Sequence, residues 1–285
     1  MHCPDRWHNA LRILISNDDG AFNPALWAMV EAVKDLGDVM VVAPDRDRSG
    51  VGAGLTLNDP VRVKSIISPV PGVQAWAVEG TPGDSVILGL KQLSEDPVDL
   101  LLSGINTGNN IGTDLIVSGT VGAALQGFLN GTASAAISVG IAGDAESPMI
   151  GAAIHDLAES MLEHVTAGGP TPFVNVNFPR ISDGPYRGAM LTGLGKRIVA
   201  DTVETQTRGY RTMYWIQRRA SALDDRSRMD PGTDIWAMRH NWVSVTPLGA
   251  ELTGVSVDGF AARLVEVLDR SVKDHAGRHA DEAAG

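Results

Sequence analysis

The order of hydrophobic and polar residues near the start of the chain predicts a strand, a helix and a second strand. The run Leu-Arg-Ile-Leu-Ile-Ser over 11–16 predicts a short strand that ends at Asn-Asp-Asp-Gly, 17–20. Asn23 and Pro24 then fit the cap and the first position of a helix, whose apolar residues recur at helical spacing. An uninterrupted apolar run over 39–43 predicts the next strand. Strand, amphipathic helix and strand within about 30 residues form a βαβ unit with parallel strands.

The same alternation continues through the next part of the chain. Strands are expected at 75–78, 98–102, 135–139 and 173–178, and helices at 81–93, 120–129 and 149–165. The strand over 98–102 is apolar except for Asp99, which is typical of a strand whose two sheet faces are both covered by helices. This pattern predicts an α/β fold, a Rossmann-like three-layer α/β/α sandwich with a mixed, mainly parallel sheet.

The pattern changes after about residue 183. The segment 200–240 is polar and rich in arginine, which predicts a protruding C-terminal extended arm or hairpin. A last strand at 242–245 and a helix at 257–272 return to the apolar pattern. No linker divides the chain convincingly, so we expect one domain over 1–285, with a core of about 11–195 and 241–272 and an arm of about 200–240.

Composition and charge narrow the classes of function. The 285 residues are 44% hydrophobic and 20% charged, as in a globular protein that can bury a sizeable core. The net charge of -11 makes a nucleic-acid partner a poor fit, because phosphate backbones attract Lys and Arg. An anionic small molecule would need a cation to mediate its binding. The single cysteine, Cys3, excludes an internal disulfide and a multi-thiolate metal site.

The chain offers no signal for a membrane. No stretch approaches the roughly 18 uninterrupted apolar residues of a spanning helix, and residues 1–10 lack the apolar run of a signal peptide. The default expectation is a cytoplasmic protein without a membrane partner.

The loop after the first predicted strand carries two adjacent carboxylates, Asp18 and Asp19. Asp-Gly after a strand is often only a turn. Two neighbouring carboxylates, however, repel each other and need a cation or donors nearby to ionise together. A dinucleotide-binding fold would place glycines here to receive a pyrophosphate. This loop presents negative charge instead, which favours a metal ion between protein and phosphate.

Two further loops leave the same edge of the predicted sheet. The loop 43–56 follows the second strand and contains the hydroxyl of Ser49, and the long loop 103–119 begins with the amide of Asn106. Ser118, Gly119 and Thr120 precede a helix, and a helix N-terminus binds anions readily. Carboxylate, hydroxyl and amide oxygens suit Mg²⁺, Mn²⁺ or Ca²⁺ rather than zinc. The loops therefore predict a hydrolytic metal site.

Several segments, in their order along the chain, carry a more specific resemblance. They are 13–20, 43–50, 80–84, 103–106 and 118–124, followed by 175–179, 214–216, 232–234 and 243–248. Together they resemble the signature segments of the SurE nucleotidase family, over roughly residues 11–250.

The resemblance implies an activity, a cofactor and a set of site residues. The activity is that of a phosphomonoesterase, a 5'-nucleotidase, which hydrolyses nucleoside 5'- and 3'-monophosphates with one divalent cation per subunit: Mg²⁺ or Mn²⁺, with Ca²⁺ also accommodated. It further implies a homodimer or homotetramer built through the C-terminal arm. The implied metal ligands are Asp18, Asp19, Ser49 and Asn106, of which Asp18, Asp19 and Asn106 are also expected to be catalytic, and the implied phosphate-binding residues are Asn110, Ser118, Gly119 and Thr120.

The chain departs from the family pattern at three places. Val117 stands where a tyrosine commonly precedes Ser-Gly-Thr, the stretch 51–54 is unusually rich in glycine, and the arm over 218–229 is highly charged. These departures bear on substrate preference and assembly. Two other functions fit the same pattern: a nucleotide- or metal-binding protein without turnover, and a Rossmann-like metal-dependent transferase. The sequence leaves open the preferred base, ester position and cation.

Overall fold

The computed structural model describes residues 11–196, 200–219 and 230–250. The chain divides into two compact units, Met1–Gly249 and Ala250–Gly285. The expectation of a single domain over 1–285 stays a prediction, because residues 251–285 lie outside the described residues. The predicted helix at 257–272 lies outside the described residues. None of the described helices is both long and apolar enough to cross a membrane.

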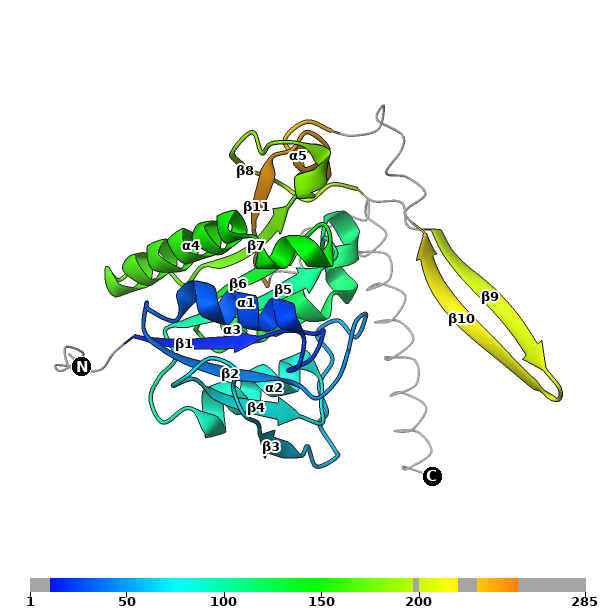
Figure 1. Ribbon diagram of the computed structural model, residues 1–285, viewed down its shortest axis with the longest axis horizontal. Helices are drawn as coiled ribbons and strands as arrows, with labels where there is room; N and C mark the ends of the chain where they lie inside the picture. Colours follow the sequence, from blue (N-terminus) through cyan, green and yellow to red (C-terminus); the bar gives the residue numbers. More distant parts are fainter. Residues whose placement is uncertain (1–10, 197–199, 220–229, 251–285) are drawn as a thin grey trace, which may run out of the picture. The chain divides into compact units, whose positions relative to one another are not determined.

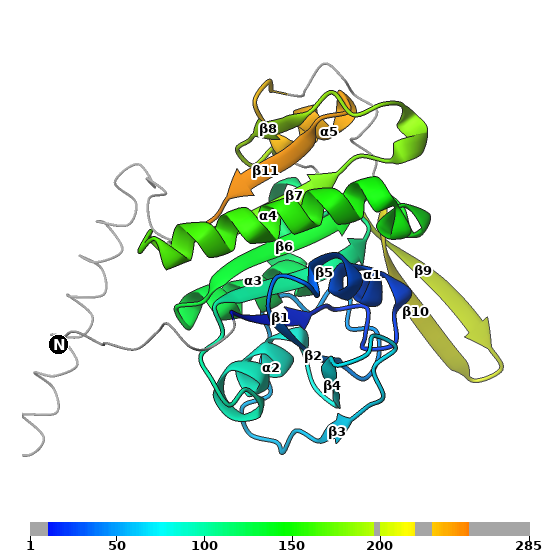
Figure 2. The same cartoon turned by 60° about the vertical axis from the view of Figure 1, so that its left-hand side comes forward.

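A mixed, mainly parallel sheet forms the centre of the first unit (Figures 1 and 2). Its described strands, in spatial order, are β3 (Val63–Ser65), β4 (Gln74–Val78), β2 (Asp38–Pro44), β1 (Arg12–Ser16), β5 (Leu100–Thr107), β6 (Ala133–Val139), β7 (Phe173–Phe178), β11 (Val243–Pro247) and β8 (Ala189–Leu191). The strands from β4 to β7 run parallel to one another. Only β3 and β11 pair antiparallel with their inner neighbours. The predicted α/β class and sheet are confirmed.

Helices cover both faces of this sheet. The helices are α1 (Pro24–Val33), α2 (Pro82–Leu88) with a π-helical continuation η1 (Gly89–Leu93), α3 (Gly119–Leu129), α4 (Pro148–Thr166) and α5 (Asp234–Arg239); short 3₁₀ turns are η2 (Gly112–Val117), η3 (Ala142–Glu146) and η4 (Ile181–Asp183). α1 and α4 pack together on one face, and α2 and α3 on the other (Figure 1). This is the expected three-layer sandwich.

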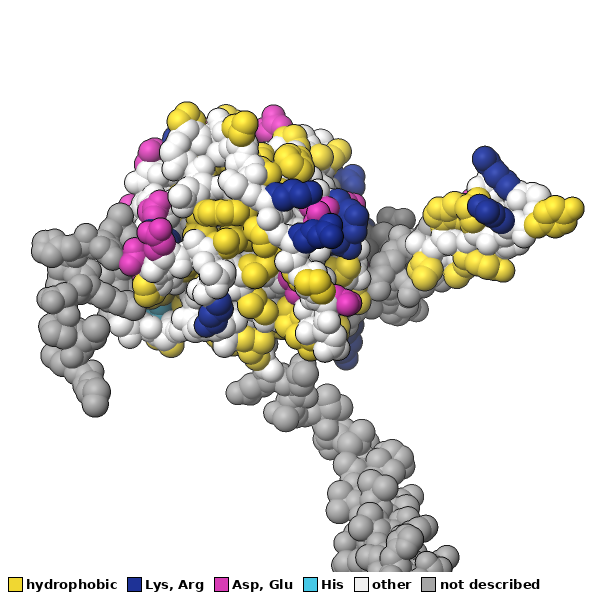
Figure 3. Space-filling model, turned by 90° about the horizontal axis from the view of Figure 1, so that it is seen from below, with side chains coloured by type: hydrophobic (Ala, Val, Ile, Leu, Met, Phe, Trp, Pro, Cys, Tyr) yellow, Lys and Arg dark blue, Asp and Glu magenta, His cyan; other side chains and the backbone are white. Residues whose placement is uncertain are grey.

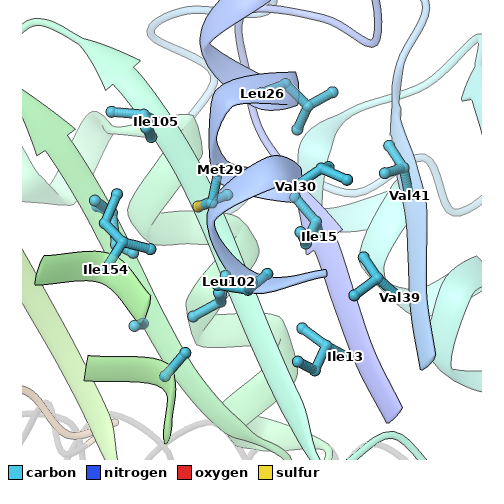
Figure 4. Close-up of a cluster of buried hydrophobic side chains, with 14 of the residues drawn as sticks. Ile13, Ile15, Leu26, Met29, Val30, Val39, Val41, Leu102, Ile105 and Ile154 are labelled. Atoms are coloured by element: carbon cyan, nitrogen blue, oxygen red, sulfur yellow. The ribbon is translucent and has the colours of Figure 1, made fainter. Parts of the chain in front are cut away.

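Alternation along β1 explains how one strand serves both layers. Ile13 and Ile15 join the core under α1, whereas Leu14 joins the core under α2. Figure 4 shows Leu26 and Met29 of α1 directed at the strands that carry Ile15 and its neighbours. Burial of each such side chain stabilises the fold by about 1.5–3 kcal/mol. The cap and first position of α1 are Asn23 and Pro24, as the sequence predicts.

β5 differs from its predicted extent, and the difference matters for the site. The strand was expected to end at residue 102, with a loop starting at Ser103; it continues to Thr107. Its register against β6 shifts between Ser103 and Asn106. Gly104 allows this, because its φ of +140° disfavours side chains and a Cβ there would collide with the carbonyl oxygen of Ile137. The bulge sets the direction of Asn106 at the strand end.

The predicted arm is shorter in the structure. A hairpin of β9 (Ala200–Arg208) and β10 (Arg211–Arg219) occupies only its first half. Residues 230–249 belong to the first unit, and α5 packs into its core by burying Ile235, Ala237 and Met238. The polar composition of this stretch hid the helix from the sequence pattern. Its buried carboxylate, Asp234, is tolerated in the core because main-chain amides donate to it.

Candidate functional site

Asp18 and Asp19 directly follow β1, at the carboxyl end of the parallel strands. Asn17 closes the loop: its side chain accepts from the Gly20 amide at 3.1 Å and donates to the Gly20 carbonyl at 3.0 Å. Gly20 has a φ of +103° and lies against the main chain of Arg46, in the loop after β2. The loop is therefore a tight turn that is fixed on the protein side and presents both carboxylates at the sheet edge.

The surroundings of both carboxyl groups disfavour their ionised form, so both pKa values are raised. Burial raises the pKa of Asp18, although the Thr120 hydroxyl opposes this by donating to its Oδ1 at 2.6 Å. Burial, with repulsion from the Asp18 carboxylate, raises the pKa of Asp19 to about 6. A main-chain hydrogen bond from Thr107 only partly offsets this increase. The buried Oδ2 of Asp19 has no hydrogen-bond partner in the structure. A nearby cation would relieve these groups.

Ser49 belongs to the loop after β2, which is linked to these carboxylates through its neighbours. The Arg48 amide donates to the Asp18 carbonyl at 2.7 Å, which ties this loop to the first. The Ser49 hydroxyl donates to Oδ1 of Asp47 at 2.6 Å, so its lone pairs remain available to a cation. Asp47 was not among the predicted site residues. Its charge reaches both Asp18 and Asp19, and an Asp two positions before the serine ligand was the signal that could have identified it.

Asn106 lies at the end of β5, next to β1 in the sheet. Its Nδ2 donates to the Gly108 carbonyl at 2.5 Å. This bond turns the amide so that the carbonyl oxygen is the group free to contact a ligand. The neighbouring Thr107 amide reaches Asp19, so the predicted amide oxygen and carboxylates meet at one edge of the sheet.

The predicted phosphate-binding segment begins helix α3. Ser118 is its N-cap, and the Ser118 hydroxyl accepts from the Val121 amide at 3.2 Å. Gly119 lies directly against Asp18: an added Cβ would come within 2.7 Å of the Asp18 Cβ and 2.9 Å of its Oδ2. The positive end of the helix dipole thus faces the carboxylates, with room for an anion only where a cation also binds.

Asn110 is hydrogen-bonded to the first turn of α3. Its side-chain Nδ2 donates to Ser138 Oγ at 3.0 Å and, more weakly, to Thr120 Oγ1 at 3.4 Å. The structure thus brings Asn110, Thr120 and Asp18 into one hydrogen-bonded chain.

The glycine-rich stretch 51–54 has a packing reason. The Gly52 amide donates to the Val117 carbonyl at 3.0 Å, and Gly122 on α3 leaves no space for a Cβ against the Gly52 carbonyl. The two glycines let this loop close over the start of α3. The departure at Val117 lies in the same contact, beside exposed Ile116.

These observations test whether the site fits a divalent cation. The donors are carboxylate, hydroxyl and amide oxygens, one carboxylate oxygen is buried without a partner, and the pKa values of both carboxyl groups are raised. A hard cation matches each of these features. Only two of the predicted ligands are His, Cys, Asp or Glu residues. In the described part of the chain, the one cluster of three such side chains within metal-binding distance is His155, Asp156 and Glu159 on the surface of α4.

Comparison with known proteins decides the family. The family model described as "Survival protein SurE" matches residues 13–201. The chain belongs to the SurE family.

Curated SurE relatives match most of the chain. The "5'-nucleotidase SurE" of Dehalococcoides mccartyi (strain CBDB1) is 39% identical over 244 residues, covering 85% of this chain and 90% of the relative. The protein of the same name from Pelotomaculum thermopropionicum is 36% identical over 272 residues, covering 93% and 100%. The crystal structure of the SurE protein from Aquifex aeolicus is 34% identical, with a TM-score of 0.65 over 90% of this chain and 99% of that one.

Proposed function

We propose that this SurE-family protein is a divalent-metal-dependent phosphomonoesterase that hydrolyses nucleoside 5'- and 3'-monophosphates to nucleoside and phosphate. The observation that carries the proposal is a pair of adjacent carboxylates at the sheet edge: the buried Asp18 lies directly against the N-terminus of α3, and the partly buried Asp19 has an Oδ2 without a partner. Negative side chains facing an anion-binding helix end make sense chemically when a cation joins the phosphate to the protein. The name shared by the curated relatives supports the nucleotide substrate.

The proposed ligands are Asp18, Asp19, Ser49 and Asn106. When bound, a divalent cation would offset the negative charge of the phosphate and lower the pKa of a bound water. The all-oxygen donor set suits Mg²⁺, Mn²⁺ or Ca²⁺ rather than zinc.

The chain's own groups then bind and orient the ester. The main-chain amide of Gly119 is the proposed donor for a non-bridging phosphate oxygen, because the Ser118 hydroxyl caps the helix, and both the hydroxyl and the main-chain amide of Thr120 are committed to Asp18. Water adds to phosphorus in line with the ester oxygen, the ester P–O bond breaks, and the departing nucleoside oxygen takes up a proton. Asp18 is buried, and the Thr120 hydroxyl that donates to its carboxylate fixes the orientation of that carboxylate at the site.

A phosphate-release assay tests the function. The full-length protein, treated with EDTA and then supplied with Mg²⁺ or Mn²⁺, is incubated with 5'- and 3'-nucleoside monophosphates. We expect release only with added cation, because no side chain in the described site supplies the missing positive charge. Absence of release with every cation and substrate would contradict the proposal and favour a binding protein without turnover; sugar transfer to an acceptor without release would favour the transferase.

We further propose that the β9–β10 hairpin joins copies of the chain into a dimer or tetramer. Its described strands pair only with each other in the sheet assignment, and Val203, Tyr214 and Ile216 are more than half exposed. Figure 3 shows apolar side chains in yellow together with basic ones in dark blue on the hairpin surface. An isolated two-stranded hairpin is marginal in water, so a second surface is expected to cover it.

A variant lacking residues 200–219 tests this assembly. We expect a lower mass in solution than for the full chain, measured by light scattering. An unchanged mass would contradict the assignment of the hairpin as the contact surface.

A further inference from the structure

Two asparagines within strand β7 stand out because nothing proposed so far uses them. Asn175 and Asn177 are fully buried, as is Ser138 on the neighbouring strand β6. Buried polar side chains are retained only with hydrogen bonds, since an unpaired one costs free energy. The bonds that these residues make converge on one position, Asn110.

The two asparagines bond both the main-chain amide and the main-chain carbonyl of Asn110. The Asn110 amide donates to Asn177 Oδ1 at 2.9 Å. Its carbonyl oxygen accepts from Asn177 Nδ2 at 3.0 Å and from Asn175 Nδ2 at 2.8 Å. Asn177 thus reproduces the paired donor and acceptor of a strand partner for a residue that is not in a strand. Asn175 adds one donor, while its own Oδ1 has no partner.

The side chain of Asn110 is fixed as well, and in one orientation. The Thr120 hydroxyl has a single proton, which it gives to the Asp18 carboxylate. Toward Asn110, Thr120 can therefore only accept, so the amide nitrogen of Asn110 must face it. Ser138 Oγ accepts from the same nitrogen. From Asn110 the donors run through Thr120 to Asp18, whereas toward the strands Asn110 donates to Ser138 and Asn177 and accepts from Asn177 and Asn175.

We propose that Asn177, assisted by Asn175 and Ser138, is a positioning residue that sets Asn110 and, through Thr120, the orientation of the Asp18 carboxylate. The inference rests on the proposed metal-dependent function and adds to it the residues that pre-organise its ligand. None of these three side chains touches substrate or cation; they act through Asn110.

The test is a double-mutant cycle with a matched structural control. Asn177→Ala is made in the wild-type and Thr120→Val backgrounds. Thr246→Val is the control: Thr246 is also buried, lies opposite Asn175 on the adjacent strand β11, and its hydroxyl bonds Thr192 at 2.8 Å rather than Asn110. The measurements are kcat and KM for a nucleoside 5'-monophosphate, the dissociation constant of Mn²⁺ by calorimetry, and Tm.

Side chains that orient a ligating group cost about 10- to 100-fold in metal affinity or activity when replaced. We expect Asn177→Ala to lower kcat/KM and weaken Mn²⁺ binding within that range. In the Thr120→Val background, where the connection is already broken, we expect a further loss of less than about threefold, because coupled residues are not additive. Thr246→Val should lower Tm and leave both other quantities within about threefold of wild type.

If Asn177→Ala does not fold, Ser138→Ala takes its place. This variant removes only the hydroxyl that accepts from the side-chain Nδ2 of Asn110. A loss of about 3- to 10-fold in kcat/KM is expected. Equal losses in both backgrounds, or Mn²⁺ affinity and kcat/KM that match the Thr246→Val control, would overturn the positioning role. Wild-type protein without phosphate release would instead contradict the proposed function, so the two failures are distinguishable.

Discussion

Replacing Asp19 by asparagine is expected to abolish metal-dependent phosphate release and, at the same time, to stabilise the metal-free protein at pH 8. The two effects have one origin, a carboxylate that the fold holds ionised without a partner for its Oδ2. Loss of a metal ligand removes several kcal/mol of charge stabilisation in the transition state, which corresponds to roughly 10³-fold in rate at 1.36 kcal/mol per decade.

The stability effect depends on pH in a direction that can be stated in advance. Burial and the Asp18 carboxylate raise the pKa of Asp19 to about 6, so ionisation of this group opposes folding. That penalty is absent below about pH 4, grows as the carboxyl group ionises, and is complete above pH 6. Because the group is partly exposed and screened, we expect about 1–2 kcal/mol. The asparagine variant lacks the penalty.

The measurement is urea unfolding of the EDTA-treated wild type and variant at pH 8 and pH 5, beside the release assay with added Mn²⁺. The stability advantage of the variant should shrink as the pH falls below 6. Asp156→Asn, at an exposed carboxylate on α4, serves as control and should change neither stability nor activity. More than a tenth of wild-type turnover in Asp19→Asn, or an advantage that does not change with pH, would refute the assignment.

Among substitutions that add a single methyl group to the site, Gly119→Ala is expected to cause the largest loss of activity. The added Cβ would meet Asp18 at 2.7 Å from its Cβ and 2.9 Å from its Oδ2, closer than Cβ contacts in proteins allow. Either the helix start or the Asp18 side chain has to move. A misplacement of about 1 Å at a reacting centre can cost about 10²-fold in rate, and overpacking costs about 1–3 kcal/mol of stability.

Kinetics and thermal unfolding of Gly119→Ala are compared with those of Gly143→Ala. Gly143 lies in η3, and a Cβ there would contact nothing within 4 Å. The control should retain wild-type activity and Tm, since the added methyl group meets no neighbour. Wild-type kcat/KM in Gly119→Ala would mean that the contact between α3 and Asp18 relaxes without consequence, which would remove the close packing from the account of the site.

The sequence predicts those parts of the site that follow from strand polarity. Once β1 and β2 are expected to be parallel, their following loops must meet at one edge, and the acidic and serine residues in those loops become neighbours. What could not be predicted depends on long-range geometry. The sequence pattern assigns Ser103 and Asn106 to a glycine-rich loop, because the bulge at Gly104 that keeps them in strand β5 forms only by pairing with β6. Asn175 and Asn177 alternate with apolar residues and read as the solvent side of a strand, although both are buried under Asn110.

The carboxylate of Asp234 has a consequence for protein engineering. With no exposed surface, it accepts from the Gly112 amide, which begins the turn leading to Ser118, and from the Gly195 amide, five residues before β9, both at 2.7 Å. The hairpin is therefore not a separable module. A chimaera that exchanges hairpins between relatives should carry the stretches around 193–195 and 230–239 with them, since a graft that breaks this shared anchor would disturb the phosphate-binding turn along with the assembly.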